Sequence, residues 1–224
     1  KLSIEQQLGR IFKVGLNSLN TYSVRKGEGA NPMGQALRAS PLASPYDSAG
    51  NILNTYVPGS ANQVWNPLAD LIPGAAVESR KRLGTFTTLY LEANLFKGLK
   101  YRLNAGAEIR NDIYGNFYSE KTSFRVNQGG SGSSNRTNLS NNYTLENLLI
   151  YDATIAKRHK INFTGLYSLQ EVANQQNQFD NTNILADYLG YFNPTYGSNL
   201  KGSGSTSKAD ILSYMGRVNY SFDD

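Results

Sequence analysis

The sequence has 224 residues, a formal net charge of +5 and a mean hydropathy of −0.46. No apolar run approaches the roughly 20 residues of a transmembrane helix, which excludes a helical membrane protein, and the absence of cysteine excludes a disulfide framework or a thiolate metal site. The excess Lys and Arg residues form no basic run interleaved with aromatic residues, so nucleic acid is not an expected partner.

The chain opens with a predicted hairpin. Residues 1–8 and 12–25 each place apolar side chains at every second position, which is the periodicity of a strand with one apolar and one polar face. Gln6 and Ser18 interrupt the pattern, so the register of this hairpin stays open. Residues 26–82 follow without periodicity and contain most of the prolines, and we expect a long loop there.

Residues 85–110 carry the clearest pattern in the chain. In the second half of this stretch every odd position is apolar and no even position is, as in a strand between an apolar and a polar environment. Pairing Leu95 with Leu99 keeps the apolar faces together, because a one-residue slip would exchange the faces, and it predicts a three-residue turn. The same register places Glu92 opposite Arg102 on the polar face, a favourable charge pair.

A third hairpin is predicted over residues 139–155 and 161–171, which alternate in the same way. Pairing Ile155 with Ile161 keeps its apolar faces together. The turn between these strands contains His159, the only histidine, surrounded by Lys and Arg residues. Because these like charges would repel a metal ion, we expect a solvated turn and no metal ligand there.

Short and long connections alternate along the predicted sheet. Short turns follow the first, third and fifth strands, whereas long polar loops follow the second, fourth and sixth, at about 26–82, 111–138 and 172–207, before a last strand over 208–222. Outer-membrane barrels have this alternation, and the strands are long enough to cross a bilayer at a tilt. We therefore expect an all-β antiparallel up-and-down meander of about seven long strands, with its apolar face toward lipid and its polar face toward a lumen.

The polar face supplies the candidate site residues. The carboxylates Glu92, Glu108, Glu146 and Asp152 are expected to form ion pairs with arginines, and not an acid–base pair. A single histidine gives no convincing catalytic triad, so we predict no enzyme, no cofactor and no catalytic or metal-binding residue. The lumen-facing candidates are Lys100, Arg102, Asn104, Glu108, Arg110, Asn162, Thr164, Arg217 and Asn219.

Several phrases resemble the SusC/RagA family of TonB-linked outer-membrane proteins. Residues 211–224, ILSYMGRVNYSFDD, resemble the family's strand pattern L-x-S-Y-x-G-R-x-N-Y-x-Y/F-x-D. Residues 143–165 are similar to a strand–turn–strand of the family in which a histidine sits at the periplasmic turn. The phrases FKGLK at 96–100 and NPLA at 66–69 also fit, so the matches extend over nearly the whole chain.

The resemblance implies a wall section, residues 1–224, of a 22-stranded transmembrane β-barrel in the cell outer membrane. This section would lack the plug domain that such a barrel closes around, and the remaining strands. Proteins of this family import oligosaccharides or peptides, are driven by TonB through the plug, and pair with a SusD-like lipoprotein. The loops that carry Tyr46, Trp65, Tyr191 and Tyr196 would then meet the lipoprotein or the cargo.

A soluble secreted β-sheet module, such as an adhesin or another binding protein, is the alternative interpretation. Antiparallel sheets in soluble proteins also alternate when one face packs on a core. That interpretation requires a second apolar layer over the apolar face of residues 89–109, and a chain that is monomeric without detergent.

Overall fold

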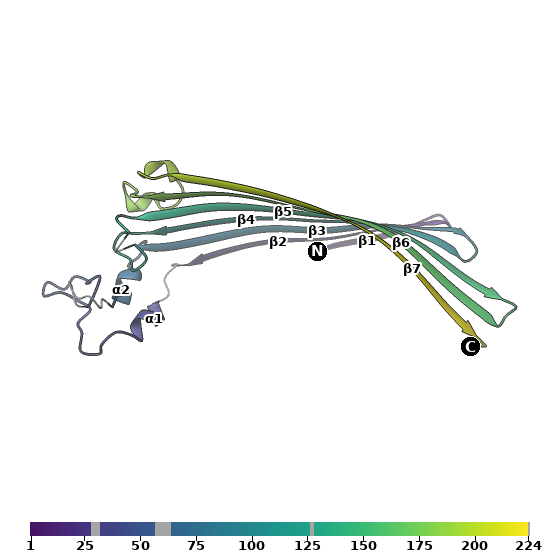
Figure 1. Ribbon diagram of the computed structural model, residues 1–224, viewed down its shortest axis with the longest axis horizontal. Helices are drawn as coiled ribbons and strands as arrows, with labels where there is room; N and C mark the ends of the chain where they lie inside the picture. The colour runs from purple at the N-terminus through teal and green to yellow at the C-terminus, as the bar shows by residue number, and fades with distance from the viewer. Residues whose placement is uncertain (28–31, 57–63, 126–127, 224) are drawn as a thin grey trace.

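The computed structural model describes residues 1–27, 32–56, 64–125 and 128–223, and Figure 1 shows them as one curved, strongly twisted sheet with small helices at one end. The seven strands lie in the order β1-β2-β3-β4-β5-β6-β7 and every neighbouring pair is antiparallel. Each strand therefore pairs with its neighbours in sequence, and the predicted up-and-down meander is confirmed.

The elements have the following bounds. The strands are β1 (Leu2–Leu8), β2 (Phe12–Gly27), β3 (Ala76–Phe96), β4 (Leu99–Tyr118), β5 (Gly132–Ile155), β6 (His159–Thr182) and β7 (Lys201–Phe222). The helices are α1 (Pro32–Ala36), α2 (Pro67–Asp70) and the 3₁₀ turns η1 (Asp187–Leu189) and η2 (Pro194–Tyr196). In the described ranges, no helix has the length and apolar content needed to span a membrane.

The strands are longer than the alternation predicted, so the loops are shorter. The connections run over 28–75, 119–131 and 183–200, whereas the sequence predicted loops over about 26–82, 111–138 and 172–207. Residues 28–31, 57–63 and 126–127 of those predicted loops lie outside the described residues. The three connections meet at one end of the sheet, the loop end, and the short turns meet at the other, the turn end (Figure 1).

Two predicted turn registers are wrong. Phe96 pairs with Leu99 and the register shifts between Asn94 and Phe96, so Leu95 lies at a β-bulge and the turn has two residues. A bulge adds one residue to one strand, and this lets the apolar faces stay aligned without the three-residue turn. At the next hairpin His159, and not Ile161, pairs with Ile155.

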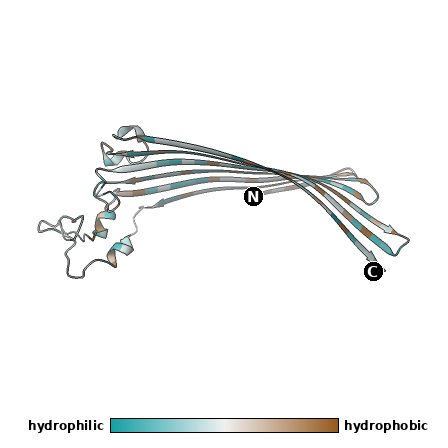
Figure 2. Cartoon of the chain, in the orientation of Figure 1, coloured by the Kyte–Doolittle hydropathy of each residue, from teal (hydrophilic) through white to brown (hydrophobic). Residues whose placement is uncertain are grey.

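The register assigns each strand residue to one of two faces. Leu91 pairs with Leu103 on the apolar face and Glu92 pairs with Arg102 on the polar face, as predicted. The hydropathy colouring in Figure 2 alternates along the strands near the turn end. Apolar side chains of this face are open, with Leu89 50% exposed and Leu149 40% exposed. Within the described ranges no second layer covers them, contrary to the requirement of a soluble sandwich.

The apolar face forms a band of defined height. On β5 it extends from Leu145 to Ile155, about ten steps of roughly 3.3 Å, or about 33 Å along the strand. A tilt of about 40° reduces this length to a height of roughly 25 Å, which is the apolar height of outer-membrane barrels. The next row toward the loop end places Glu171 and Asp210 on the same face, and this row ends the band.

The buried residues gather at the loop end, where the three connections pack together. Phe117 and Ala76 are fully buried there. Asp70 of α2 accepts hydrogen bonds from the backbone N–H and the hydroxyl of Ser123, at 2.7 and 2.5 Å. The Ser119 hydroxyl donates to Asp187 at 2.7 Å. These contacts connect α2 to residues 119–125, and residues 119–125 to 183–200.

Candidate functional site

The polar face of the sheet brings the predicted site residues together. Lys100, Arg102, Asn104, Glu108 and Arg110 alternate along β4 and therefore share one face. The other four candidates lie on β6 and β7 and share this face. Across the sheet, Lys100 is opposite Ile150 and Asn104 is opposite Glu146, Ile150 pairs with Thr164, and Thr164 pairs with Arg217. Asn162, two residues from Thr164 on β6, pairs with Asn219.

An ion-pair network crosses the first four strands near the turn end. Arg102 donates to Glu92 at 2.8 Å, and Lys100 lies 3.7 Å from the same carboxylate. Lys13 pairs with Glu5 at 2.8 Å on β2 and β1. Opposite charges thus lie on adjacent strands, which is the cross-strand arrangement that stabilises a sheet. The predicted pair of Glu92 with Arg102 is confirmed.

Tyr90 connects the two parts of this network. Its ring lies over Gly15 of β2, where an added Cβ would be 2.1 Å from the ring. The guanidinium of Arg102, on β4, lies 4.6 Å from the centroid of the same ring. The Tyr90 hydroxyl donates to Glu5. A larger side chain at position 15 would displace this ring. Tyr90 does not stand out in the sequence, since tyrosine occurs on both faces of the sheet.

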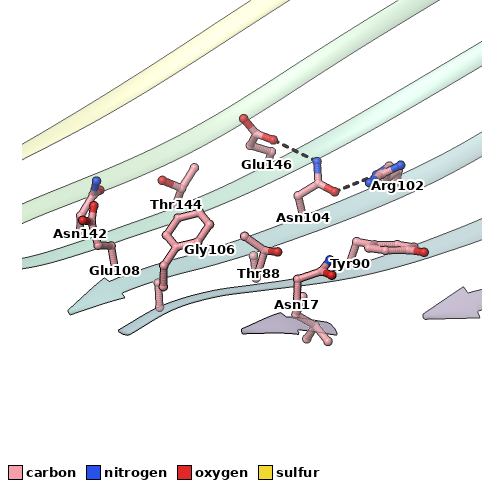
Figure 3. Close-up of a pocket in the computed structure, with 14 residues that line it drawn as sticks. Asn17, Thr88, Tyr90, Arg102, Asn104, Gly106, Glu108, Asn142, Thr144 and Glu146 are labelled. Carbon is pink, nitrogen blue, oxygen red and sulfur yellow. Dashed lines mark hydrogen bonds between the residues drawn. The ribbon is translucent and has the colours of Figure 1, made fainter. Parts of the chain in front are cut away.

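A hollow of about 440 Å³ lies beside this network (Figure 3). Its floor is the row Thr88, Gly106 and Thr144, in which the small side chains leave space above the backbone. Asn104 forms part of its wall, accepting from Arg102 at 2.8 Å and donating to Glu146 at 3.0 Å. The volume suits a small polar group, and the walls offer donors and acceptors.

Other predicted residues take part in local pairs. Arg110 pairs with Glu108 on the same strand. Asn162 donates to Asp152 at 2.7 Å and accepts from Asn219 at 3.2 Å. His159 is the first residue of β6, so it is not in the turn as predicted, and its Nδ1 lies 2.8 Å from the Tyr220 hydroxyl. No group of residues that could hold a metal ion occurs in the described part of the chain.

Several charged residues of the polar face lie where loops were predicted. Arg80 and Arg82 on β3 both bind Asp112 on β4, with Nε–Oδ distances of 2.8 and 3.0 Å. Arg136 on β5 stacks over Tyr114, with its guanidinium carbon 5.3 Å from the ring centroid. The alternation of Glu78, Arg80 and Arg82 along the sequence was a signal for a polar strand face, although the intervening residues are not apolar.

The structure separates the four loop candidates into two pairs. Tyr46 and Trp65 belong to the segment 28–75, where each forms an isolated β-bridge, with Ile52 and Thr55 respectively. In segment 183–200, Tyr191 stacks on Phe192 with a centroid distance of 4.4 Å, and Tyr196 is 50% exposed.

The Tyr191 ring occupies the space where a Cβ on Gly115 would lie. Gly115 shares the face of Ile113 and Phe117 on β4, and this is the apolar face. In contrast, Tyr118 of the polar face stacks on Phe124, with ring centroids 4.6 Å apart. Residues 183–200 therefore fold over the apolar-face side of the sheet, and residues 119–125 fold over the polar-face side.

Comparisons with known proteins give one kind of match. No protein-family profile matches the chain, and no curated protein matches it. Among solved structures, the RagAB peptide importer in the closed-closed state superposes with a TM-score of 0.74 over 98% of this chain at 15% identity. The chain has the fold of a section of that importer. A structure of the RagAB peptide transporter superposes with a TM-score of 0.73 over 98% of this chain at 16% identity. The RagAB peptide importer in the open-open state superposes with a TM-score of 0.67 over 99% of this chain at 18% identity.

The chain spans 25% of the length of each of these RagAB chains. The resemblance to the SusC/RagA family that the motifs indicated is thus confirmed at the level of the fold.

Proposed function

We propose that this chain is part of the barrel wall of a TonB-dependent nutrient importer of the outer membrane. The observation that carries the proposal is the superposition of 98% of the chain on a peptide importer, at a TM-score of 0.74. The open apolar band of about 25 Å supports a lipid-facing surface. The edges β1 and β7 would pair with further strands of the barrel, because unpaired edges are not tolerated in lipid.

Peptides are the proposed cargo, since the solved neighbours are described as peptide importers, and oligosaccharides are the alternative. In this proposal the ion-pair network and the hollow at Gly106 line the lumen, where they contact the plug or the passing solute. In this proposal the chain takes part in transport and not in catalysis.

A lipoprotein of the SusD type is the proposed partner at the loop end. Tyr46, Trp65, Tyr191 and Tyr196 are the proposed contacts with this partner or the cargo. The packing of the three connections against one another supports a stable docking surface, because Asp70 and Ser119 hold them together through short hydrogen bonds. TonB would act through the plug.

The test places single cysteines on the two faces of the complete transporter in liposomes. Leu91, Leu103 and Tyr167 represent the apolar face, and the polar face is represented by Asn94, Asn104 and Ser168. A label on the first set should be quenched by lipid-borne agents and a label on the second set by aqueous agents. If neither set is quenched from the lipid, the transporter assignment is wrong.

Cargo is tested separately by uptake. Cells that carry the complete transporter should accumulate fluorescent oligopeptides, and this uptake should stop when TonB or the lipoprotein is deleted. Uptake of oligosaccharides in place of peptides would support the alternative cargo. Uptake that is independent of TonB would contradict the proposed mechanism.

A further inference from the structure

Four arginines surround one tyrosine on the polar face near the loop end. Arg80, Tyr114 and Arg136 form one row across β3, β4 and β5, so the two arginines are separated by one intervening strand. Strands lie about 4.8 Å apart, which places their Cα atoms roughly 10 Å from each other. Arg82 lies opposite Asp112 in the next row, and Arg110 lies on β4 two residues from Asp112. We call Arg80, Arg82, Arg110 and Arg136 the arginine cluster.

The cluster lies beyond the apolar band. Arg136 is nine residues from Leu145, the residue at which the band begins on β5. At about 3.3 Å per residue this is roughly 30 Å along the strand. Arg136 and Arg80, which share one row, therefore occupy the part of the wall that extends out of the membrane in the proposed barrel, where a solute arriving from the loop end first meets the polar face.

The carboxylates in this region do not balance the arginines. Arg80 and Arg82 share the single carboxylate of Asp112, whose side chain is only 10% exposed, and Arg110 uses Glu108. The buried Asp112 thus holds two guanidinium groups against the sheet while leaving each about 40% exposed. Glu78, two residues from Arg80 on the same face, pairs with Arg25 instead. Within the described ranges the four arginines therefore form ion pairs with only two carboxylates, and the cluster keeps an excess positive charge.

Arg136 carries much of this excess. It forms no ion pair within the described ranges, and its Nε is buried without a hydrogen-bond partner. The neighbouring acid, Asp180, instead accepts from Gln178 at 3.0 and 2.8 Å. Stacking on Tyr114 orients the guanidinium plane but satisfies none of its N–H groups. A buried N–H group of this kind is stabilised when an acceptor reaches it.

We propose that the arginine cluster is a binding site for a carboxylate group of the cargo, with Arg136 as its central donor. A guanidinium binds a carboxylate through two parallel N–H···O bonds, and the exposed parts of Arg80 and Arg82 add favourable charge on the other side of Tyr114. The inference rests on the proposed function, because the polar face must line the route of the cargo. It predicts that peptides with a free carboxylate are preferred over neutral peptides.

The test uses the complete transporter with its lipoprotein and three fluorescent peptides of the same sequence. One has a neutral composition and an amidated C-terminus, one has a free C-terminal carboxylate, and one has a Glu side chain with an amidated C-terminus. Arg136→Gln should weaken binding of one or both carboxylate peptides roughly tenfold and leave the neutral peptide unchanged, as expected for one lost charge-assisted bidentate contact. The peptide that responds identifies the source of the carboxylate.

Two further variants keep the result interpretable. Lys81→Gln removes the same charge from β3 on the opposite face, between Arg80 and Arg82, and should change no affinity. Arg136→Lys keeps the charge without the bidentate geometry and should give an intermediate loss for the responding peptide. It also shows whether a weak Arg136→Gln variant has simply failed to fold.

Several outcomes would overturn the carboxylate site. An equal loss for all three peptides, or no loss for any, removes the basis for recognition of a carboxylate. Altered protease sensitivity of the plug with unchanged peptide preference would assign the arginine cluster to a contact within the protein. If the wild-type transporter takes up none of the peptides, the proposed function itself has failed, and this result is distinct from uptake without preference.

Discussion

Replacing Asn66 by alanine should release much of the segment 28–75 from its folded arrangement. The Asn66 side chain is fully buried, accepts from the Leu68 N–H at 3.1 Å as the N-cap of α2, and donates to the carbonyl groups of Pro45 and Leu53 at 2.8 and 2.7 Å. Loss of the cap costs about 1 kcal/mol. Each of the two other hydrogen bonds contributes about 1 kcal/mol net.

The expected local destabilisation is therefore about 3 kcal/mol, which corresponds to a roughly hundredfold change in an equilibrium constant. Hydrogen exchange measures this quantity directly, because loop amides exchange through local opening. In the complete barrel, amides of residues 45–53 should exchange about a hundred times faster in Asn66→Ala. The melting temperature of the barrel should not change, since in the described ranges the side-chain hydrogen bonds of Asn66 go to Pro45, Leu53 and Leu68, which lie outside the strands.

Asn54→Ala provides the matched control. The Asn54 side chain is exposed in the same segment, and its backbone carbonyl accepts from the Asn66 N–H at 3.0 Å. Its removal should leave exchange within a factor of about two. If Asn66→Ala changes exchange no more than this control does, the three hydrogen bonds do not hold the segment and the reasoning is refuted.

Two other predictions concern the strands and the loop turn. Leu103→Arg should lower the free energy of unfolding of the barrel in lipid by about 2 kcal/mol, and Asn104→Arg should lower it by less. Denaturant unfolding in vesicles measures both values. A larger cost at position 104 would reverse the assignment of faces. At the loop end the side-chain amide of Asn51 and nearby backbone N–H groups lower the pKa of Asp47. Because the pKa is lowered, the ionised carboxylate stabilises the turn fully above the usual carboxyl pKa, and this stability is lost as the pH falls through the lowered value. Hydrogen exchange at the Asn51 amide should therefore accelerate only in that acidic range.

The strands inside the apolar band could be predicted because one of their faces carries an apolar side chain at every second position. From Leu99 to Ile109 the odd positions are apolar and the even positions are not, so the period of two is complete and the register of Glu92 with Arg102 follows from it. The long connections were also predictable at the correct places, since prolines and glycines interrupt the pattern there. The bulge at Leu95 was not, because it changes the turn without changing either face.

Beyond the band the same strands continue with no such rule. Arg80, Arg82 and Arg136 lie on regular strands, yet their sequence neighbours on the other face include Lys81, Ser79 and Asn135. Both faces meet water there, so the alternation disappears while the backbone pairing persists. These residues were therefore assigned to loops, and the arginine cluster was missed for the same physical reason.

The sequence by itself determined which residues share the apolar face, because that choice depends on side-chain hydropathy alone at every second position. Only the tertiary structure decided how far the strands extend and which loop residues pack together, since both depend on hydrogen bonds, backbone bonds in the strands and side-chain bonds in the loops, between segments distant in sequence. Asp70 reaches Ser123 and Ser119 reaches Asp187 through such contacts, and no local pattern specifies them. The pairing of Arg80 and Arg82 with Asp112 likewise requires β3 and β4 to remain in register far beyond the apolar band.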